Sequence, residues 1–164
     1  MKNLLSLLSC IMLFGGCSHQ NGFSKFAMEP SQERSANSIQ SSKIIKNGAT
    51  EGVLSLVYLN EVDPNVYNTH EYFLLSIYNK AKKELNDPNS FLQEGIEITL
   101  NGKMPIKIKK LSKDEAIVTR IFSQSTWNRY YLVAFEEEKG NALRLFLKGE
   151  GISSGILRYN KNEE

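Results

Sequence analysis

The chain has 164 residues, enough for one ordinary domain with a single hydrophobic core. Twenty Lys and Arg against 18 Asp and Glu give a net charge of +2, which excludes the strong positive field typical of nucleic-acid binding. The two cysteines, Cys10 and Cys17, both lie near the N-terminus, which excludes a disulfide framework, and with two histidines a structural zinc site has almost no ligands.

Residues 1–16 have the pattern of an export signal. Lys2 supplies a short positive segment, and the apolar residues 4–14 form a stretch of signal-peptide length. This stretch is shorter than the roughly 20 residues that a membrane-spanning helix needs. Gly15 and Gly16 then place small residues directly before Cys17, where a signal peptidase must fit the backbone.

The run Phe14-Gly15-Gly16-Cys17 resembles the lipobox of bacterial lipoproteins, although that family more usually has Leu where Phe14 stands. The resemblance implies that the Cys17 thiol carries a diacylglycerol and that Cys17 is the first residue of the mature protein. Two or three acyl chains hold a protein firmly on a membrane. Ser18, in place of a retaining Asp, favours the outer membrane, at its periplasmic face or at the cell surface. An ordinary secretory peptide cut near Gly16 and a retained hydrophobic anchor are the alternatives.

Residues 17–48 are predicted to be the lipidated cysteine followed by a flexible linker. The segment from Ser18 onward is rich in Ser, Asn, Gln and Gly and has no sustained apolar period. A segment of this composition buries too little apolar surface to offset the entropy lost on ordering. About 30 flexible residues reach roughly 30 Å.

Residues 49–164 are predicted to form an all-β domain. Short runs of Val, Ile, Leu, Tyr and Phe alternate with polar residues and are bounded by Gly, Asn, Asp and Pro. The expected strands are 52–60, 71–79, 95–100, 103–111, 115–122, 129–136, 143–148 and 156–159. This spacing, without long helices between strands, favours an antiparallel immunoglobulin-like β-sandwich of about seven or eight strands.

Asn101-Gly102 gives the strongest turn signal, because a two-residue type I′ turn needs positive φ at both positions. It predicts a hairpin of 95–100 with 103–111, in which Pro105 delays the second strand. The nearly continuous apolar run 73–78 is typical of a strand covered on both faces. Residues 80–85 are predicted to form one helical turn that Asp87-Pro88 ends, and Gly149, Gly151 and Gly155 indicate bulges or a close approach of the backbone.

The layout also resembles small immunoglobulin-like lipoprotein domains of Campylobacter-type bacteria, with 72–79 similar to a central strand and its turn. This resemblance covers about two thirds of the chain and concerns architecture only, since the paired cysteines of antibody domains are missing.

The sequence offers no recognisable catalytic constellation, and we predict neither enzymatic activity nor a metal or cofactor. A nucleophilic triad would have to use His70, the one imidazole of the domain, which we interpret as an exposed loop residue. The acids near Pro64 could ligate calcium but are better explained as turn residues, and Glu136-Glu137-Glu138 is interpreted as a solvated hairpin end.

The candidate binding surface consists of Trp127, Tyr130, Lys107 and Lys109. Exposed Trp and Tyr are typical anchors of interfaces, although part of the aromatic group must be core because successive residues of one strand face opposite ways. The lysines could meet an acidic glycan or lipid, or they protect a strand edge from aggregation.

These observations favour a membrane-anchored, non-enzymatic binding module, with an adhesin as one form of it. Its partner would be an envelope protein, a host surface or a glycan, and not nucleic acid. The alternative is an accessory subunit of an envelope assembly, and a hydrolase is the third and least favoured hypothesis.

Overall fold

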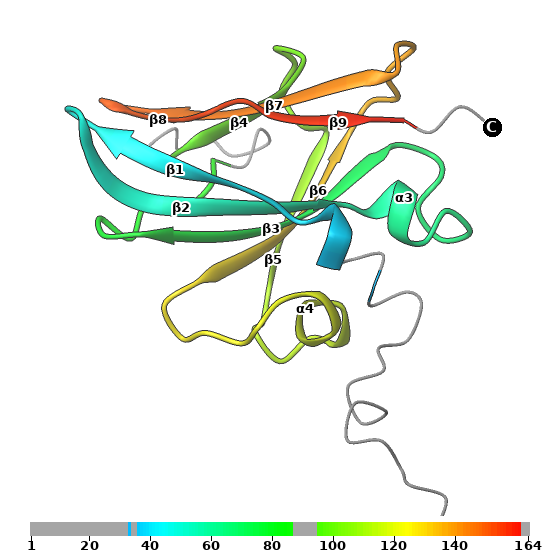
Figure 1. Cartoon of the computed structure of the whole chain (residues 1–164), viewed down its shortest axis with the longest axis horizontal. Helices are drawn as coiled ribbons and strands as arrows, with labels where there is room; N and C mark the ends of the chain where they lie inside the picture. The colour runs from blue at the N-terminus through cyan, green and yellow to red at the C-terminus, as the bar shows by residue number, and fades with distance from the viewer. Residues whose placement is uncertain (1–32, 34–35, 87–94, 162–164) are drawn as a thin grey trace, which may run out of the picture.

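The computed structural model describes residues 33, 36–86 and 95–161 (Figure 1). The predictions on residues 1–32, among them the signal peptide, the lipobox and Cys17, lie outside the described residues. The prediction that Asp87-Pro88 ends a helical turn lies outside them as well. In the described part, no helix is long and apolar enough to cross a membrane.

The described residues form one nine-stranded sheet, and each named strand pair is antiparallel. The strands are β1 (Gln40–Lys46), β2 (Ala49–Tyr58), β3 (Glu71–Asn79), β4 (Glu97–Leu100), β5 (Lys107–Leu111), β6 (Arg129–Phe135), β7 (Ala142–Gly149), β8 (Ile152–Ser154) and β9 (Leu157–Asn160). Two short helices, α3 (Leu59–Val62) and α4 (Ala116–Ile121), complete the fold. The predicted all-β, antiparallel class is confirmed.

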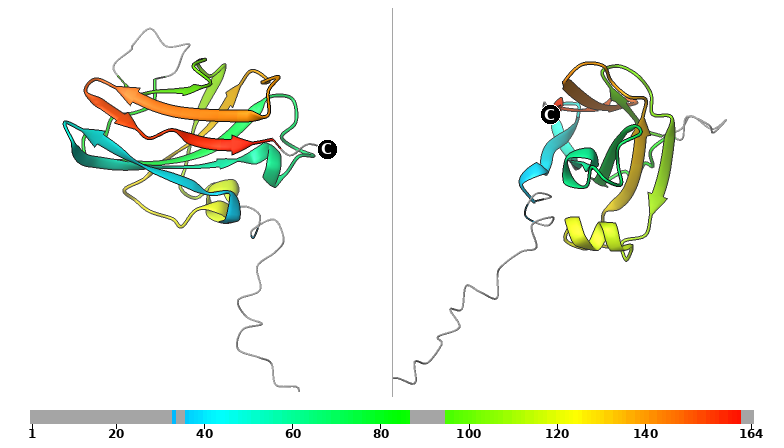
Figure 2. Two further views of the ribbon diagram at one scale, coloured as in Figure 1. Left: turned by 45° about the horizontal axis from the view of Figure 1, so that its top comes forward. Right: turned by 90° about the vertical axis from the view of Figure 1, so that its right-hand side faces the viewer.

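The sheet curls on itself (Figures 1 and 2). Its strand order is β4-β7-β8-β1-β2-β3-β6-β5, with β9 paired to β7, so β4 and β5 are the two ends of the sheet. Those two ends are joined by residues 101–106 alone. Asn101 and Gly102 have the positive φ angles of 49° and 84° that the turn prediction requires.

The predicted hairpin of β4 with β5 is nevertheless wrong beyond its turn. One bridge, Leu100 to Lys103, closes the turn, after which β4 pairs with β7 and β5 pairs with β6. Pro105 has no N–H to donate to a ladder, so the chain leaves the turn without pairing and crosses to the other end of the sheet.

The concave face of the curled sheet encloses the larger core. Phe73, Leu75 and Ile77 of β3 are at most 1% exposed there and pack with side chains from β2, β4, β6, β7 and β9. Leu74 points to the opposite face and packs under α4. The prediction that β3 is covered on both faces is therefore confirmed.

Residues 115–122, predicted as a strand, contain helix α4 instead. Val118 and Ile121 are buried three residues apart, which is a helical spacing. A turn precedes the helix, and in it Glu115 Oε1 accepts a hydrogen bond from the Ser112 N–H at 3.2 Å. The prediction is wrong because it weighted the β-branched residues above the helical spacing of Val118 and Ile121.

The predicted linker boundary at residue 48 is also wrong, because β1 lies inside that segment. Ile44 is fully buried in the larger core, and β1 pairs with both β2 and β8. Asn47 and Gly48, with φ of 50° and 79°, make a two-residue turn into β2. Asn47-Gly48 is the same turn signal as Asn101-Gly102, but the residues around it are mostly polar and do not show the alternation of a strand.

We expect Gly48→Ala to destabilise the protein by about 1 kcal/mol, because an L-residue with a side chain resists the left-handed φ of this turn. Space is not the cause, since no atom lies within 4 Å of the added Cβ. Gly140→Ala is the matched control, because Gly140 has the same open surroundings without a left-handed φ. Urea midpoints that shift equally for both variants would contradict this reading of the turn.

The remaining differences are local. Residues 80–85 form a turn and a bridge from Leu85 to Ile96 rather than a helical turn. The glycine-rich segment near the end contains the short strand β8, which was not predicted, and Gly151 makes the turn before it with a φ of 67°.

Candidate functional site

Polar side chains gather at two places in the described part of the chain, at opposite ends of β3. One is a buried cluster around Glu71, where β3 begins, and the other is a cavity beside Trp127, where β3 ends.

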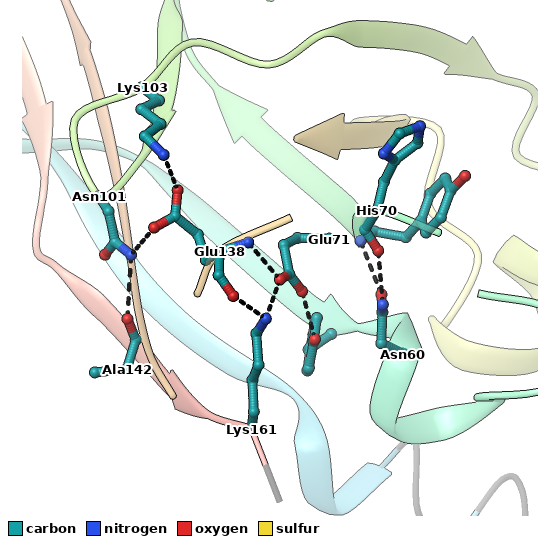
Figure 3. Close-up of polar contacts among 10 residues, drawn as sticks. Asn60, His70, Glu71, Asn101, Lys103, Glu138, Ala142 and Lys161 are labelled. Carbon is teal, nitrogen blue, oxygen red and sulfur yellow. Dashed lines mark hydrogen bonds and ion pairs between the residues drawn. The ribbon is translucent and has the colours of Figure 1, made fainter. Parts of the chain in front are cut away.

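The cluster around Glu71 is a closed network (Figure 3). The Glu71 carboxylate is 1% exposed and accepts hydrogen bonds from the Tyr58 hydroxyl at 2.6 Å and from the Glu138 N–H at 2.9 Å. Lys161 forms an ion pair with it and also donates to the Glu138 carbonyl. Burial and the hydrogen bond to Glu71 raise the pKa of the Tyr58 hydroxyl. Because both carboxylate oxygens have partners, the cluster fastens the C-terminal end of the chain to β3.

The Glu138 side chain extends this network toward the turn at Asn101. Lys103 Nζ lies 2.7 Å from Glu138 Oε1, and Asn101 Nδ2 donates to Oε2 at 3.2 Å. The hydrogen bond from Lys103, and then that from Asn101, holds the pKa of the Glu138 carboxyl below its usual range. Asn101 also donates to the Ala142 carbonyl, so the turn between the two ends of the sheet is fixed by side chains.

His70 does not join these carboxylates, although it precedes Glu71 directly. Its backbone carbonyl accepts from Asn60 Nδ2 at 2.6 Å, while its imidazole points away from Glu71 and Glu138 (Figure 3). The imidazole packs near the Tyr72 ring, with centroids 5.9 Å apart. The arrangement therefore gives no paired base and carboxylate of the kind that a hydrolase uses.

The cavity beside Trp127 has a volume of about 480 Å³, within the range of small-ligand sites. One wall is the end of β3 and the turn after it, with Tyr78, Asn79, Lys80 and Lys82. The other wall is the segment that leads into β6, with Thr126, Trp127, Asn128 and Arg129. Trp127 is 73% exposed, which is high for so large an aromatic side chain.

Buried side chains hold both walls in place. Asn79 is 2% exposed and forms two hydrogen bonds with the backbone of Lys83, at 2.8 and 3.0 Å. On the other wall the Tyr130 hydroxyl donates to the Ser123 carbonyl at 3.3 Å and accepts from the Ser125 N–H at 3.1 Å. Asn128 Nδ2 donates to Ser76 Oγ at 2.9 Å. The cavity is thus formed by segments that are already ordered.

The cavity carries positive charge without acidic side chains among its described lining residues. Lys82 is exposed and makes no ion pair among the described residues, while Lys80 Nζ donates to the Thr50 carbonyl at 3.0 Å. Nε and Nη2 of Arg129 are covered by protein and have no hydrogen-bond acceptor in the described part of the chain. Buried donors without an acceptor are rare and costly.

Glu84 lies behind the β3 wall and ties it to β5 and β6. Its carboxylate accepts from the Tyr131 hydroxyl and from Lys110 Nζ, the latter at 2.9 Å. Burial raises the pKa of Glu84, but the hydrogen bonds from Tyr131 and Lys110 outweigh it and leave the pKa below 4.5. Burial, followed by the bond to Glu84, raises the pKa of Tyr131.

A depressed pKa in the folded state means that Glu84 stabilises the fold above about pH 4.5 and loses this effect as the pH falls through the folded-state value. We expect the free energy of unfolding of the wild type to exceed that of Glu84→Gln by about 0.5 kcal/mol at pH 6. The difference is small because the carboxylate is half exposed and screened by water. Urea unfolding at pH 6 and pH 3 should show this difference become smaller at the lower pH. Glu150→Gln, at a site 95% exposed, is the control, and a difference as large at pH 3 as at pH 6 would contradict the assignment.

The structure separates the four residues of the predicted binding surface. Trp127 is exposed, as predicted, but Tyr130 is 1% exposed in the smaller core, so its surface role is wrong. Tyr130 lies on the face of β6 that α4 covers, and its hydroxyl shapes the wall behind Trp127 instead. Lys107 and Lys109 are exposed on β5, at an apolar hollow of about 320 Å³ with Tyr72, Ile106 and Leu132.

Another cavity, of about 650 Å³, is a weaker candidate. It is lined by charges that pair with each other, Lys148 with Glu97 at 3.2 Å and Lys83 with Glu150 at 3.8 Å. In the part of the chain that the structure describes, no three His, Cys, Asp or Glu side chains are grouped to hold a metal ion. The residues that sequence reasoning missed are Arg129, Lys82 and Tyr78, whose proximity to Trp127 depends on the pairing of β3 with β6.

The comparisons give this chain no relative. No protein-family model, no curated protein and no solved structure matches it.

Proposed function

We propose that the protein is a lipid-anchored, non-enzymatic binding module of the bacterial envelope or cell surface, and that the cavity beside Trp127 is its binding site. The observation that carries this proposal is a tryptophan, 73% exposed, at a cavity of ligand size. Aromatic side chains at the mouth of an ordered pocket are typical binding anchors, because they supply contact area at little cost in entropy.

The position of the cavity supports the proposal. Gln40, where β1 begins, pairs with Leu56 of β2, and Leu56 pairs with Leu75 of β3, so Gln40 and Leu75 lie at the same level of the sheet. Asn79 at the cavity is four residues further along β3, about 13 Å away at 3.3 Å per residue. The strands thus carry the cavity away from the end at which the N-terminal segment enters the fold (Figure 1). In a protein anchored through Cys17, a site so placed would face away from the membrane.

Binding is tested with the mature chain carrying Cys17→Ser, sedimented with bacterial envelopes and with cultured host cells. We expect a saturable bound fraction on one of these surfaces, and a loss of about tenfold in affinity for Trp127→Ala, as for a well-packed anchor. Val66→Ala, which truncates an apolar side chain that is 64% exposed and lies in neither candidate site, is the control. If neither surface binds the chain, or if Trp127→Ala binds as well as the parent, the proposal fails.

The lipid anchor is tested separately on the native protein in cells. Intact mass should show acyl chains on the wild type and not on Cys17→Ala, and whole-cell protease shaving should show on which side of the membrane the domain lies. A wild type without acyl chains would contradict the anchor. A lipidated but protected domain would direct the search for a partner to the periplasm.

An accessory subunit of an envelope assembly is the second candidate, and one observation favours it. The strand β5 lies at the end of the sheet, so one of its edges is unpaired in the described structure. The apolar hollow with Tyr72, Ile106 and Leu132 lies next to this edge. An extended segment of another protein could add to such an edge. Site-specific cross-linking from position 106 to a defined envelope protein would favour this function over the first.

The immunoglobulin-like arrangement is part of the same proposal. Among the described residues, strand pairing joins β4, β7 and β9 to the other five strands only through the short strand β8, and the larger core lies between the two groups. Two layers joined so narrowly support a sandwich. An experimental structure in which β8 pairs with both β1 and β7 over a longer range would instead favour a barrel.

A further inference from the structure

We infer that the ligand of the cavity beside Trp127 is an acidic saccharide, whose carboxylate meets the cations of the cavity and whose ring lies on the indole. This inference rests on the proposed function and adds the chemical class of the ligand.

The charge of the cavity selects an anion. Lys80, Lys82 and Arg129 line it, and no Asp or Glu is among the described lining residues. The cavity of about 650 Å³ differs in this respect, because its two lysines, Lys83 and Lys148, already have glutamate partners. Lys82 makes no ion pair among the described residues. Arg129 is close enough to Glu84 to act on it electrostatically, but its Nε and Nη2 have no hydrogen-bond acceptor among the described residues. Cations that still have donors to offer form a favourable site for a carboxylate, since a charge-assisted hydrogen bond is stronger than a neutral one.

Arg129 gives this argument a specific donor. Nε and Nη2 form one edge of the guanidinium, and that edge matches the two oxygens of a carboxylate. It is the edge that has no acceptor among the described residues. Because protein atoms cover it, the Arg129 side chain has to rotate toward the cavity when the ligand binds. The carboxylate then supplies the acceptors that the unbound fold lacks.

The aromatic wall selects a ring with an apolar face. Trp127 is 73% exposed and Tyr78, across the cavity, is 36% exposed. A pyranose presents the C–H bonds of one face to such a ring and its hydroxyl groups to the edge. Asn128 uses its Nδ2 on Ser76, so its Oδ1 is available to accept from a hydroxyl group. The volume of about 480 Å³ suits one or two sugar rings.

The site needs little reorganisation beyond Arg129. Asn79 fixes the turn that carries Lys80 and Lys82, and Tyr130 fixes the segment that carries Trp127. Lys82 itself has a positive φ of 54°, which the hydrogen bond from its N–H to the Asn79 carbonyl at 3.1 Å helps to hold. Ordering costs that oppose binding are therefore small.

The experiment uses a property of the sequence, because Trp127 is the single tryptophan of the chain. Its fluorescence reports on this cavity alone. The mature chain carrying Cys17→Ser is titrated with trigalacturonic acid, with its methyl ester, which keeps the ring and removes the charge, and with maltotriose as the neutral control. We expect the acid to change the Trp127 emission saturably and to bind at least about tenfold more tightly than the ester, as for the loss of one charged hydrogen bond.

Variants connect the signal to the cavity. Lys82→Glu should weaken binding of the acid by about tenfold or more, whereas Lys139→Glu makes the same change of charge at an exposed lysine between β6 and β7 and should have little effect. Equal affinity for acid and ester, equal effects of the two variants, or no response to any of the three saccharides would overturn the inference. The envelope and host-cell assay with Trp127→Ala decides the proposed function independently, so an uncharged or unrelated ligand would refute this inference and leave the binding module standing.

Discussion

Phe73→Ala is expected to destabilise the domain by about 4 kcal/mol, a large part of the stability of an ordinary domain. Phe73 is fully buried in the middle of the larger core. Its ring lies 5.0 Å from the Tyr58 ring, 6.0 Å from that of Phe135 and 5.7 Å from that of Tyr159. Truncation removes these contacts and leaves a cavity that strands on three sides cannot fill by collapsing.

Tyr78→Ala is the matched control, since it truncates an aromatic residue of the same strand. Tyr78 is 36% exposed on the opposite face, so we expect a loss below about 1.5 kcal/mol. Urea unfolding followed by circular dichroism measures both. A loss for Phe73→Ala no greater than that for Tyr78→Ala would show that the larger core is not packed as described.

Lys161→Met should destabilise the domain by about 3 kcal/mol, because it leaves the Glu71 carboxylate buried without its cation. The Glu71 side chain is 2% exposed and that of Lys161 is 23% exposed, so the pair is shielded from water on the carboxylate side. The methylene groups of Lys161 have an apolar equivalent in methionine, which isolates the effect of the charge.

Two further variants test this interpretation. Lys139→Met removes an exposed lysine next to Glu138 and should lower the free energy of unfolding by less than about 0.5 kcal/mol. Glu71→Leu combined with Lys161→Met should be more stable than Lys161→Met alone, since no unpaired charge stays buried. A double variant less stable than the single one would assign the main role of Glu71 to its bonds with Tyr58 and Glu138 rather than to Lys161.

The strands that the sequence predicts well are those with one clear apolar face. β3 was predicted with its observed bounds, and β6 and β7 to within one or two residues, because their alternation follows their burial. β1 was missed because Ile44 is its only fully buried residue, and its other positions are polar or partly exposed. α4 was missed because Ile117, Val118 and Ile121 have high β propensity, which the packing of Val118 and Ile121 in the smaller core overrides.

Sequence reasoning found one element of the candidate site. Trp127 stood out as an aromatic residue in a polar segment, and its exposure is confirmed. Tyr130 was assigned to the wrong face, since a single strand does not reveal that α4 would cover it. Arg129 and Lys82 could not be connected with Trp127, because β3 and β6 are brought together by long-range pairing and no local pattern records that register.

The side chain of Gln40 copies a strand backbone, since its amide donates to the Arg158 carbonyl and accepts from the Arg158 N–H at 3.1 Å. The start of β1 is thereby clamped to β9, while β1 itself lies between β2 and β8. A pull between the N-terminal segment and a ligand at Trp127 would run along the strands, since Asn79, at the cavity, lies four residues further along the strand direction than the level of Gln40. The β1 and β2 ladder would then bear the load in shear, with all its hydrogen bonds strained together. Such a geometry resists tension far better than a hairpin that is opened one bond at a time.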